Sequence, residues 1–171
     1  MKILLNVPYH SQFIEVEDSF WNIRSCGGAC IKMCLDYYGK ESPSVLDIML
    51  QAKSSGGYDM KNGFVHDWAV EYFLTHGLHS YRKEGLLGLD EILNSLKDNN
   101  PVIVSISKRV LEQNKFHLIL VVGCEVDDNG KVISLTYHEP ERTDEKEGAF
   151  RVCDTETFIN SWRQKGIFVS V

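Results

Sequence analysis

The first half of the chain carries apolar residues at helical spacing. Ala29, Met33 and Tyr37 share one face of a segment from about residue 26 to 38, and Gly39 follows where a left-handed C-terminal cap belongs. Three further periodic segments, each bounded by turn-forming residues, predict helices at about 44–52, 64–75 and 89–96. Ahead of them, residues 5–12 are predicted to be extended and to lead into a loop.

The second half of the chain changes to runs of β-branched and aromatic residues separated by turn residues. These runs predict strands at 102–107, 116–125, 131–138, 149–153 and 167–171, with a short helix at about 155–163 before the last strand. Helices followed by strands predict an α+β fold with a largely antiparallel sheet. The 171 residues suffice for one compact core, so we expect a single domain over 1–171.

Composition and charge argue against several classes of function. Apolar residues make up 43% of the chain and charged residues 25%, which is typical of a globular protein and not of a disordered chain or fibre. The formal net charge is −6 and no basic run exceeds two residues, whereas nucleic-acid binding needs clustered Lys and Arg. The longest apolar run is too short to span a membrane. We therefore expect neither a nucleic-acid partner nor a membrane partner.

The N-terminus and the cysteines bear on the compartment. The first residues lack the apolar stretch and cleavage site of a secretory signal. Five cysteines are an odd and sparse set, unlike the even sets of small secreted disulfide folds. Both observations favour a reducing compartment, and we expect the protein to be cytoplasmic.

Three of the cysteines, Cys26, Cys30 and Cys34, fall on one face of the first predicted helix. They form a candidate metal site, but three ligands on one continuous helix suit tetrahedral zinc poorly. Burial of Cys30 and Cys34 in the core is the favoured interpretation, because free cysteine is among the most buried residue types. We expect no metal and no cofactor.

Cys26 is a candidate nucleophile because it stands at the predicted start of a helix. The positive end of the helix dipole and the unpaired backbone N–H groups there favour a thiolate over a thiol. Gly27 and Gly28 follow it and are expected to leave the sulfur open to a substrate. The alternative is a small apolar residue that packs a helix start. Catalysis would require a base beside Cys26.

His117 is the candidate base. It is the single titratable residue at the head of an otherwise apolar strand, followed by the run at 118–122. A polar residue in that position belongs at an end of the sheet, against a group that it contacts. The alternative is a hydrogen-bonded core histidine.

The predicted hairpin after this strand supplies a third group. A three-residue turn at 128–130, with Gly130 left-handed, pairs Asp127 with Lys131 and places His117 opposite Glu141. His117 and Glu139 are then diagonal neighbours on one face, within side-chain reach of each other. Glu139 could orient the imidazole as the third member of a triad. A two-residue turn would put the two side chains on opposite faces.

Together these features resemble the C39-like peptidase family, a branch of the papain-like superfamily. The resemblance rests on residues 7–12, 21, 26–29, 36–39, 101–104, 116–123, 139–140 and 162–171. It implies a papain-like fold with N-terminal helices packed on the sheet, Cys26 as nucleophile and His117 as general base. It also implies Gln12 as the side-chain donor of an oxyanion hole. The chain departs from the family in having Glu139 where Asp is usual and Gly28 where Pro is commoner.

The function predicted from these residues is that of a cysteine hydrolase, specifically a peptidase acting on a peptide or protein through a thioester acyl-enzyme. A papain-fold acyl or peptidyl transferase would use the same acyl-enzyme with a different acceptor. A catalytically idle peptide-binding module would share only the fold. The acidic stretch 139–147 is expected to be a solvated loop after its first residue, and it would repel acidic substrates if it bordered the cleft.

Overall fold

The computed structural model describes residues 1–107 and 116–171. Its helical elements are α1 (Gln12–Glu15), the 3₁₀ helix η1 (Asn22–Arg24), α2 (Cys26–Tyr37), α3 (Val45–Ser54), α4 (His66–Thr75), α5 (Leu89–Lys97), α6 (Glu145–Gly148) and α7 (Thr155–Ser161). Its strands are β1 (Lys2–Leu4), β2 (Tyr58–Asp59), β3 (Gly63–Phe64), β4 (His79–Glu84), β5 (Val102–Ser107), β6 (Phe116–Val126), β7 (Val132–His138), β8 (Arg151–Asp154) and β9 (Trp162–Ser170).

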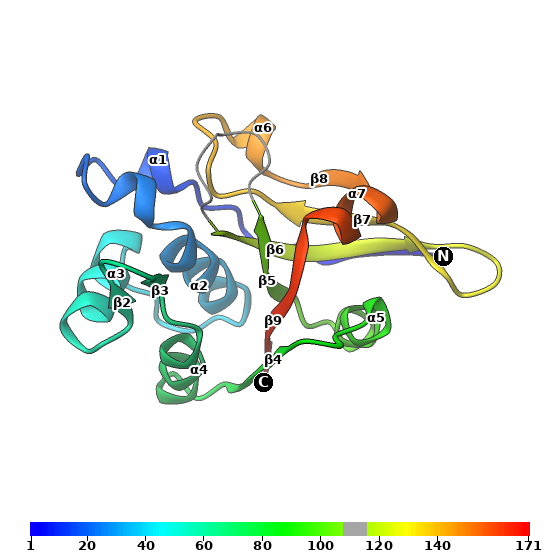
Figure 1. The fold of residues 1–171 in the computed structure, drawn as a ribbon, viewed down its shortest axis with the longest axis horizontal. Helices are drawn as coiled ribbons and strands as arrows, with labels where there is room; N and C mark the ends of the chain where they lie inside the picture. Colours follow the sequence, from blue (N-terminus) through cyan, green and yellow to red (C-terminus); the bar gives the residue numbers. More distant parts are fainter. Residues whose placement is uncertain (108–115) are drawn as a thin grey trace.

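The described elements divide into a helical side and a sheet side (Figure 1). Helices α1 to α4 gather on the first, and β2 and β3 form a small hairpin among them. On the second, a seven-stranded sheet has the order β4-β9-β5-β6-β7-β8, with β1 paired to β6. All of its pairings are antiparallel. The predicted α+β class, with N-terminal helices and a largely antiparallel sheet, is confirmed.

Several predicted element ends are confirmed by their local chemistry. Helix α2 begins at Cys26, and Gly39 adopts a left-handed φ of +66° just beyond its end. The hydroxyl of Ser44 accepts the Asp47 N–H at 3.1 Å and so caps α3. None of the helices described in residues 1–107 and 116–171 has the length and apolar character needed to cross a membrane.

Other elements were not predicted. Strand β4 is one of them, because it lies at the edge of the sheet and its residues are mostly exposed, which leaves no alternating pattern. Strand β9 begins at Trp162, five residues before the predicted start, because its first half is polar. Helices α1 and α6 and strands β1 to β3 are each only two to four residues long.

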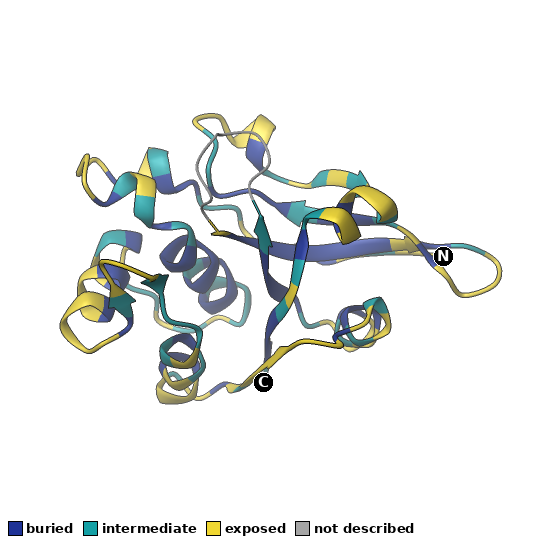
Figure 2. Cartoon of the chain, viewed as in Figure 1, coloured by how far each residue is buried: buried dark blue, intermediate teal, exposed yellow. Residues whose placement is uncertain are grey.

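Helix α2 lies at the centre of the core and is buried along most of its length (Figure 2). It packs against α3 on one side and β6 on the other. Cys30 and Cys34 are fully buried there, which confirms their predicted place in the core. A Cβ on Gly27 would lie 2.8 Å from the Phe64 ring, and one on Gly28 would lie 2.8 Å from Met49 Sδ. The two glycines therefore allow close packing around the start of α2.

Candidate active site

Cys26 is the first residue of α2, at the helix end that carries the positive dipole charge. The preceding residue, Ser25, does not cap the helix with its side chain, because its hydroxyl donates to the carbonyl oxygen of Trp21 at 2.7 Å. The Cys26 side chain is partly exposed and reaches the cleft beside the sheet. A sulfur in this position is both accessible and stabilised as a thiolate.

The pKa values of the cysteines set Cys26 apart. Burial raises the pKa of Cys26, but a hydrogen bond and the positive charge of His117, together with a backbone hydrogen bond from Leu118, outweigh burial and lower it below the ordinary value. The pKa of each of the other four cysteines, Cys30, Cys34, Cys124 and Cys153, is raised, chiefly by burial. Cys26 is therefore the thiol most easily ionised in this protein.

The structure brings His117 and Glu139 to the same place as Cys26. His117 is the second residue of β6 and only 4% exposed, and Glu139 directly follows β7 and is 7% exposed. His117 Nε2 is hydrogen-bonded to Glu139 Oε1. Burial lowers the pKa of His117, but hydrogen bonds with Cys26 and Glu139 raise it to about 9. The two shifts favour a Cys26 thiolate beside a His117 imidazolium that faces the Glu139 side chain.

The three-residue turn on which this contact depends is confirmed. The Asp127 N–H donates to the Lys131 carbonyl at 2.9 Å, and Gly130 has a φ of +82°. The register between β6 and β7 shifts twice, near Val121 and near Val126. The shifts compensate, and Leu120 pairs with His138 as the prediction requires. Because β7 ends at His138, the expected pairings of residues 139 and 141 with β6 do not form as strand pairs.

Glu141 is a second carboxylate that the sequence interpretation did not assign. Its N–H donates to Glu139 Oε1 at 3.0 Å, and its Oε2 lies 3.9 Å from His117 Nδ1. In the described residues, His117, Glu139 and Glu141 are the one group of side chains close enough to share a metal ion, with ligand atoms within 4.8 Å of one another. The three cysteines of α2 do not form such a group there. The spacing of two glutamates around Pro140 was the signal available in the sequence.

Gln12 lies close to the turn that leads into Cys26. It is the first residue of α1, which packs against η1 and α2, and its side chain is 1% exposed. Its Nε2 donates to the Asn22 carbonyl at 2.7 Å, and its backbone N–H donates to the Pro140 carbonyl at 2.9 Å. An amide nitrogen has two N–H groups, so one remains for another acceptor. Gln12 does not line the described cleft, and its role as an oxyanion donor stays a prediction.

Comparison with known proteins places the chain in a family. A family model described as the Peptidase_C39 like family matches residues 4–167. The chain belongs to this family. No curated protein matches its sequence significantly. The family and its cysteine chemistry support a cysteine peptidase.

Two solved structures that resemble this chain in fold are peptidase domains of transporters. The peptidase domain of Streptococcus ComA, a bi-functional ABC transporter involved in quorum sensing, has a TM-score of 0.64 at 19% identity, over 86% of this chain and 92% of that one. A double glycine motif protease from an AMS/PCAT transporter, in complex with its leader peptide, has a TM-score of 0.63 at 16% identity, over 98% and 94%. These matches confirm the papain-like fold.

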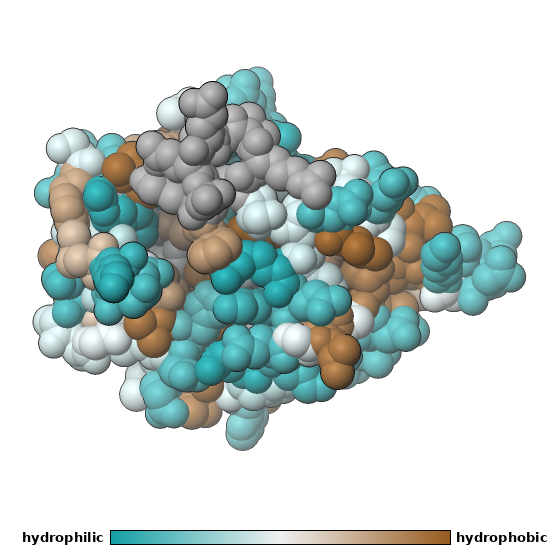
Figure 3. Space-filling view, viewed as in Figure 1, coloured by the Kyte–Doolittle hydropathy of each residue, from teal (hydrophilic) through white to brown (hydrophobic). Residues whose placement is uncertain are grey.

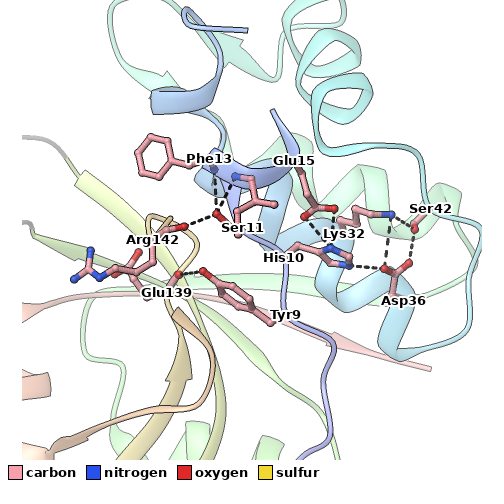
Figure 4. Close-up of polar contacts among 11 residues, drawn as sticks. Tyr9, His10, Ser11, Phe13, Glu15, Lys32, Asp36, Ser42, Glu139 and Arg142 are labelled. Atoms are coloured by element: carbon pink, nitrogen blue, oxygen red, sulfur yellow. Dashed lines mark hydrogen bonds and ion pairs between the residues drawn. The ribbon is translucent and has the colours of Figure 1, made fainter. Parts of the chain in front are cut away.

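In this C39-like chain the N-terminal segment is tied to both halves of the site (Figure 4). Tyr9 Oη donates to the Glu139 carbonyl at 2.7 Å, and Ser11 Oγ donates to the Arg142 carbonyl. His10 Nε2 lies 2.6 Å from Asp36 on α2. The segment therefore bridges the loop after β7 and the helix that begins with Cys26. Gln12 follows directly and is positioned by both attachments.

A cleft of about 650 Å³ opens beside Cys26 and His117, and we call it the Cys26 cleft. Its other walls come from η1, the β2–β3 hairpin, the start of α4, and strands β4, β5, β6 and β9. Among the described residues, none of the acidic stretch 139–147 lines the Cys26 cleft. The predicted repulsion of acidic substrates required this stretch to border the cleft, and that requirement is not met. The predicted solvated loop is confirmed only for residues 143–147, which are exposed and include most of the short helix α6; Pro140 is buried, and Glu141 and Arg142 are half-buried.

Proposed function

We propose that this protein is a cysteine peptidase that cleaves peptide bonds through a thioester formed on Cys26. The observation that supports this most directly is the position of His117, which is hydrogen-bonded to Glu139 and lies close enough to Cys26 to lower the pKa of its thiol. This arrangement stabilises a thiolate and an imidazolium together, which is the ionic state that attack on a peptide carbonyl requires.

The first half of the reaction would proceed by attack of the Cys26 thiolate on the carbonyl carbon of the scissile bond. A C–S bond forms and the carbonyl oxygen becomes an oxyanion, for which the Cys26 N–H and the Gln12 amide are the proposed donors. As the oxyanion collapses, the C–N bond breaks and the His117 imidazolium transfers its proton to the departing amine. A thioester and a neutral imidazole remain.

The second half would return the site to its starting state. Neutral His117 removes a proton from water, whose oxygen attacks the thioester carbonyl. The C–S bond then breaks, which releases the acid product and leaves the thiolate beside a protonated His117. Glu139 would orient the imidazole in both halves and stabilise its charge, as the third member of a triad does. Its longer side chain replaces the usual aspartate of the family.

We further propose that the substrate is a peptide or protein and that the enzyme works in a reducing compartment such as the cytoplasm. A C39 relative has been solved with a leader peptide bound, which supports a peptide ligand for this fold. All five cysteines are free, which suits reducing conditions.

The thiolate can be tested without a known substrate by alkylation with iodoacetamide across a range of pH, followed by mass spectrometry of each cysteine. Cys153 serves as an internal control, because it is also partly exposed and its pKa is raised to about 11. We expect Cys26 to react below pH 7, where Cys153 does not. Reaction of both cysteines only at alkaline pH would count against a catalytic thiolate.

Hydrolysis can be tested by mass spectrometry of a synthetic peptide library incubated with wild type and with Cys26→Ala. We expect cleavage products from wild type alone. Products ligated to an added amine, in place of free acids, would indicate the transferase. A reactive Cys26 that yields neither product, with peptides retained by the protein, would indicate a binding module.

A further inference from the structure

The walls of the Cys26 cleft carry an excess of positive charge, although the chain as a whole is negative. Among the described residues, five cationic and two acidic side chains line the cleft, an excess of three positive charges, whereas the whole chain has a net charge of −6. Hydrophilic residues gather over the centre of the face shown in Figure 3. The charged lining residues are Arg24, Lys61, Arg82, Arg163, Lys165, Asp67 and Glu84.

The two carboxylates of the cleft are already occupied by two of the cations. Arg82 pairs with Asp67 and lies 3.2 Å from Glu84, and Lys165 lies 3.6 Å from Glu84. Glu84 and Lys165 are direct partners across β4 and β9, so the sheet itself sets this pairing. The remaining cations, Arg24, Lys61 and Arg163, have no carboxylate partner within the described residues.

Arg163 contacts two neighbours of the described chain, one on β5 and one on β6. Its Nη1 donates to Ser105 Oγ at 2.9 Å, and its guanidinium lies 3.2 Å from the centroid of the Phe116 ring. The side chain is half-buried at the start of β9, where burial lowers its pKa although the guanidinium stays charged. A partly desolvated guanidinium, held in place by two neighbours and lacking a counter-ion, is arranged to receive an anion.

A histidine in the same cleft responds to this charge. His66, at the start of α4, has its pKa lowered to about 4, first by burial and then by the positive charges of Lys165, Arg82 and Arg163. These three cations therefore lie close enough to His66 to lower its pKa beyond the effect of burial.

We infer that the Cys26 cleft recognises a carboxylate on the substrate peptide, with Arg163 as its principal partner and Lys61 and Arg24 adding to the attraction. The carboxylate belongs either to an Asp or Glu side chain or to a free C-terminus. Guanidinium geometry matches a carboxylate in a planar, two-point contact, which favours this ligand over a neutral amide. This inference names a substrate class for the proposed peptidase and rests on that function, but the binding step can be tested without catalysis.

The experiment measures the retention of peptides on immobilised Cys26→Ala protein, which lacks the proposed nucleophile and so cannot cleave them. Two libraries, identical except for Glu or Gln at one fixed position, are each made with a free and an amidated C-terminus. We expect the Glu set or the free-acid set to be retained about tenfold or more over its neutral match. The set that is retained more strongly shows whether the carboxylate belongs to a side chain or to the C-terminus. Higher salt should reduce the preference, since the contact lies in an open cleft.

Arg163→Gln in the Cys26→Ala background should remove most of this preference. Lys131→Gln is the matched control, because it makes the same change of charge on an exposed residue of the β6–β7 turn, outside the cleft. Thermal unfolding checks that Arg163→Gln folds. If it does not, Lys61→Gln, at an exposed position, should still weaken the preference relative to Lys131→Gln.

Equal retention of the charged and neutral libraries would overturn the inference. So would an undiminished preference in folded Arg163→Gln protein. A carboxylate preference without cleavage by wild type would instead overturn the proposed peptidase and leave the binding site in place. Cleavage by wild type without any carboxylate preference would overturn the carboxylate-binding inference and leave the proposed peptidase in place.

Discussion

Replacing Glu139 with Gln tests the proposed triad at its most specific contact. Glu139 Oε1 is hydrogen-bonded to His117 Nε2 and accepts the N–H of Glu141 at 3.0 Å, in a position only 7% exposed. Glutamine keeps the size and shape of the side chain but removes its charge. The variant therefore asks how much of the proton affinity of His117 comes from that carboxylate.

The expected change in the His117 pKa can be estimated because His117 and Glu139 form a buried, hydrogen-bonded pair. A hydrogen bond to a charged group contributes about 1.5–3 kcal/mol, and about 1.4 kcal/mol corresponds to one pKa unit. The His117 pKa is raised to about 9 with Glu139 as one of its causes. Removing the negative charge destabilises the imidazolium, so the pKa should fall by about one to two units. The proton that His117 gives to the leaving amine is then lost at lower pH.

The assay is the pH dependence of kcat/KM on a peptide that wild type cleaves, supported by NMR titration of the His117 ring. In Glu139→Gln the basic limb should move from near pH 9 toward neutrality by about one to two units. Glu139→Asp retains the charge and should keep its limb closer to that of wild type. A basic limb and a His117 titration that are both unchanged in Glu139→Gln would refute the reasoning.

Three further predictions concern the residues around this centre. Gln12→Ala should lower kcat on the order of a hundredfold or more with little change in KM, as measured by steady-state kinetics. Two carboxylates outweigh burial and raise the pKa of His10, so its contribution to stability should be full below about pH 6 and fade as pH rises through the raised value. Urea unfolding of His10→Gln against wild type should accordingly differ more in acid than in alkali. In Gly148→Ala a Cβ would lie 1.8 Å from Tyr9 Oη, which should cost about 1–3 kcal/mol of stability and lower activity. Gly88→Ala, whose nearest neighbour is 4.0 Å away, should unfold close to the wild-type temperature.

The core elements could be predicted from sequence because their signals are local. Helix α2 and strand β5 bury enough apolar residues for periodicity to locate them, and Ser44 and Gly39 mark helix ends through contacts with near neighbours. Strand β4 escaped prediction because it lies at the sheet edge with most residues exposed, so no alternation distinguishes it from a loop.

The candidate site likewise contains residues that could be predicted from local sequence and contacts that could not. The sequence by itself predicted that Cys26, His117 and Glu139 lie together, because a helix start, a strand head and a three-residue turn are each determined by residues close together in the chain. Only the tertiary structure placed Arg163 beside Ser105 and Phe116 and paired Glu84 with Lys165. The charge of the Cys26 cleft is a sum over segments that are far apart in sequence. Which charges meet, and which are left unpaired, is decided by strand order and register, and no local pattern encodes these.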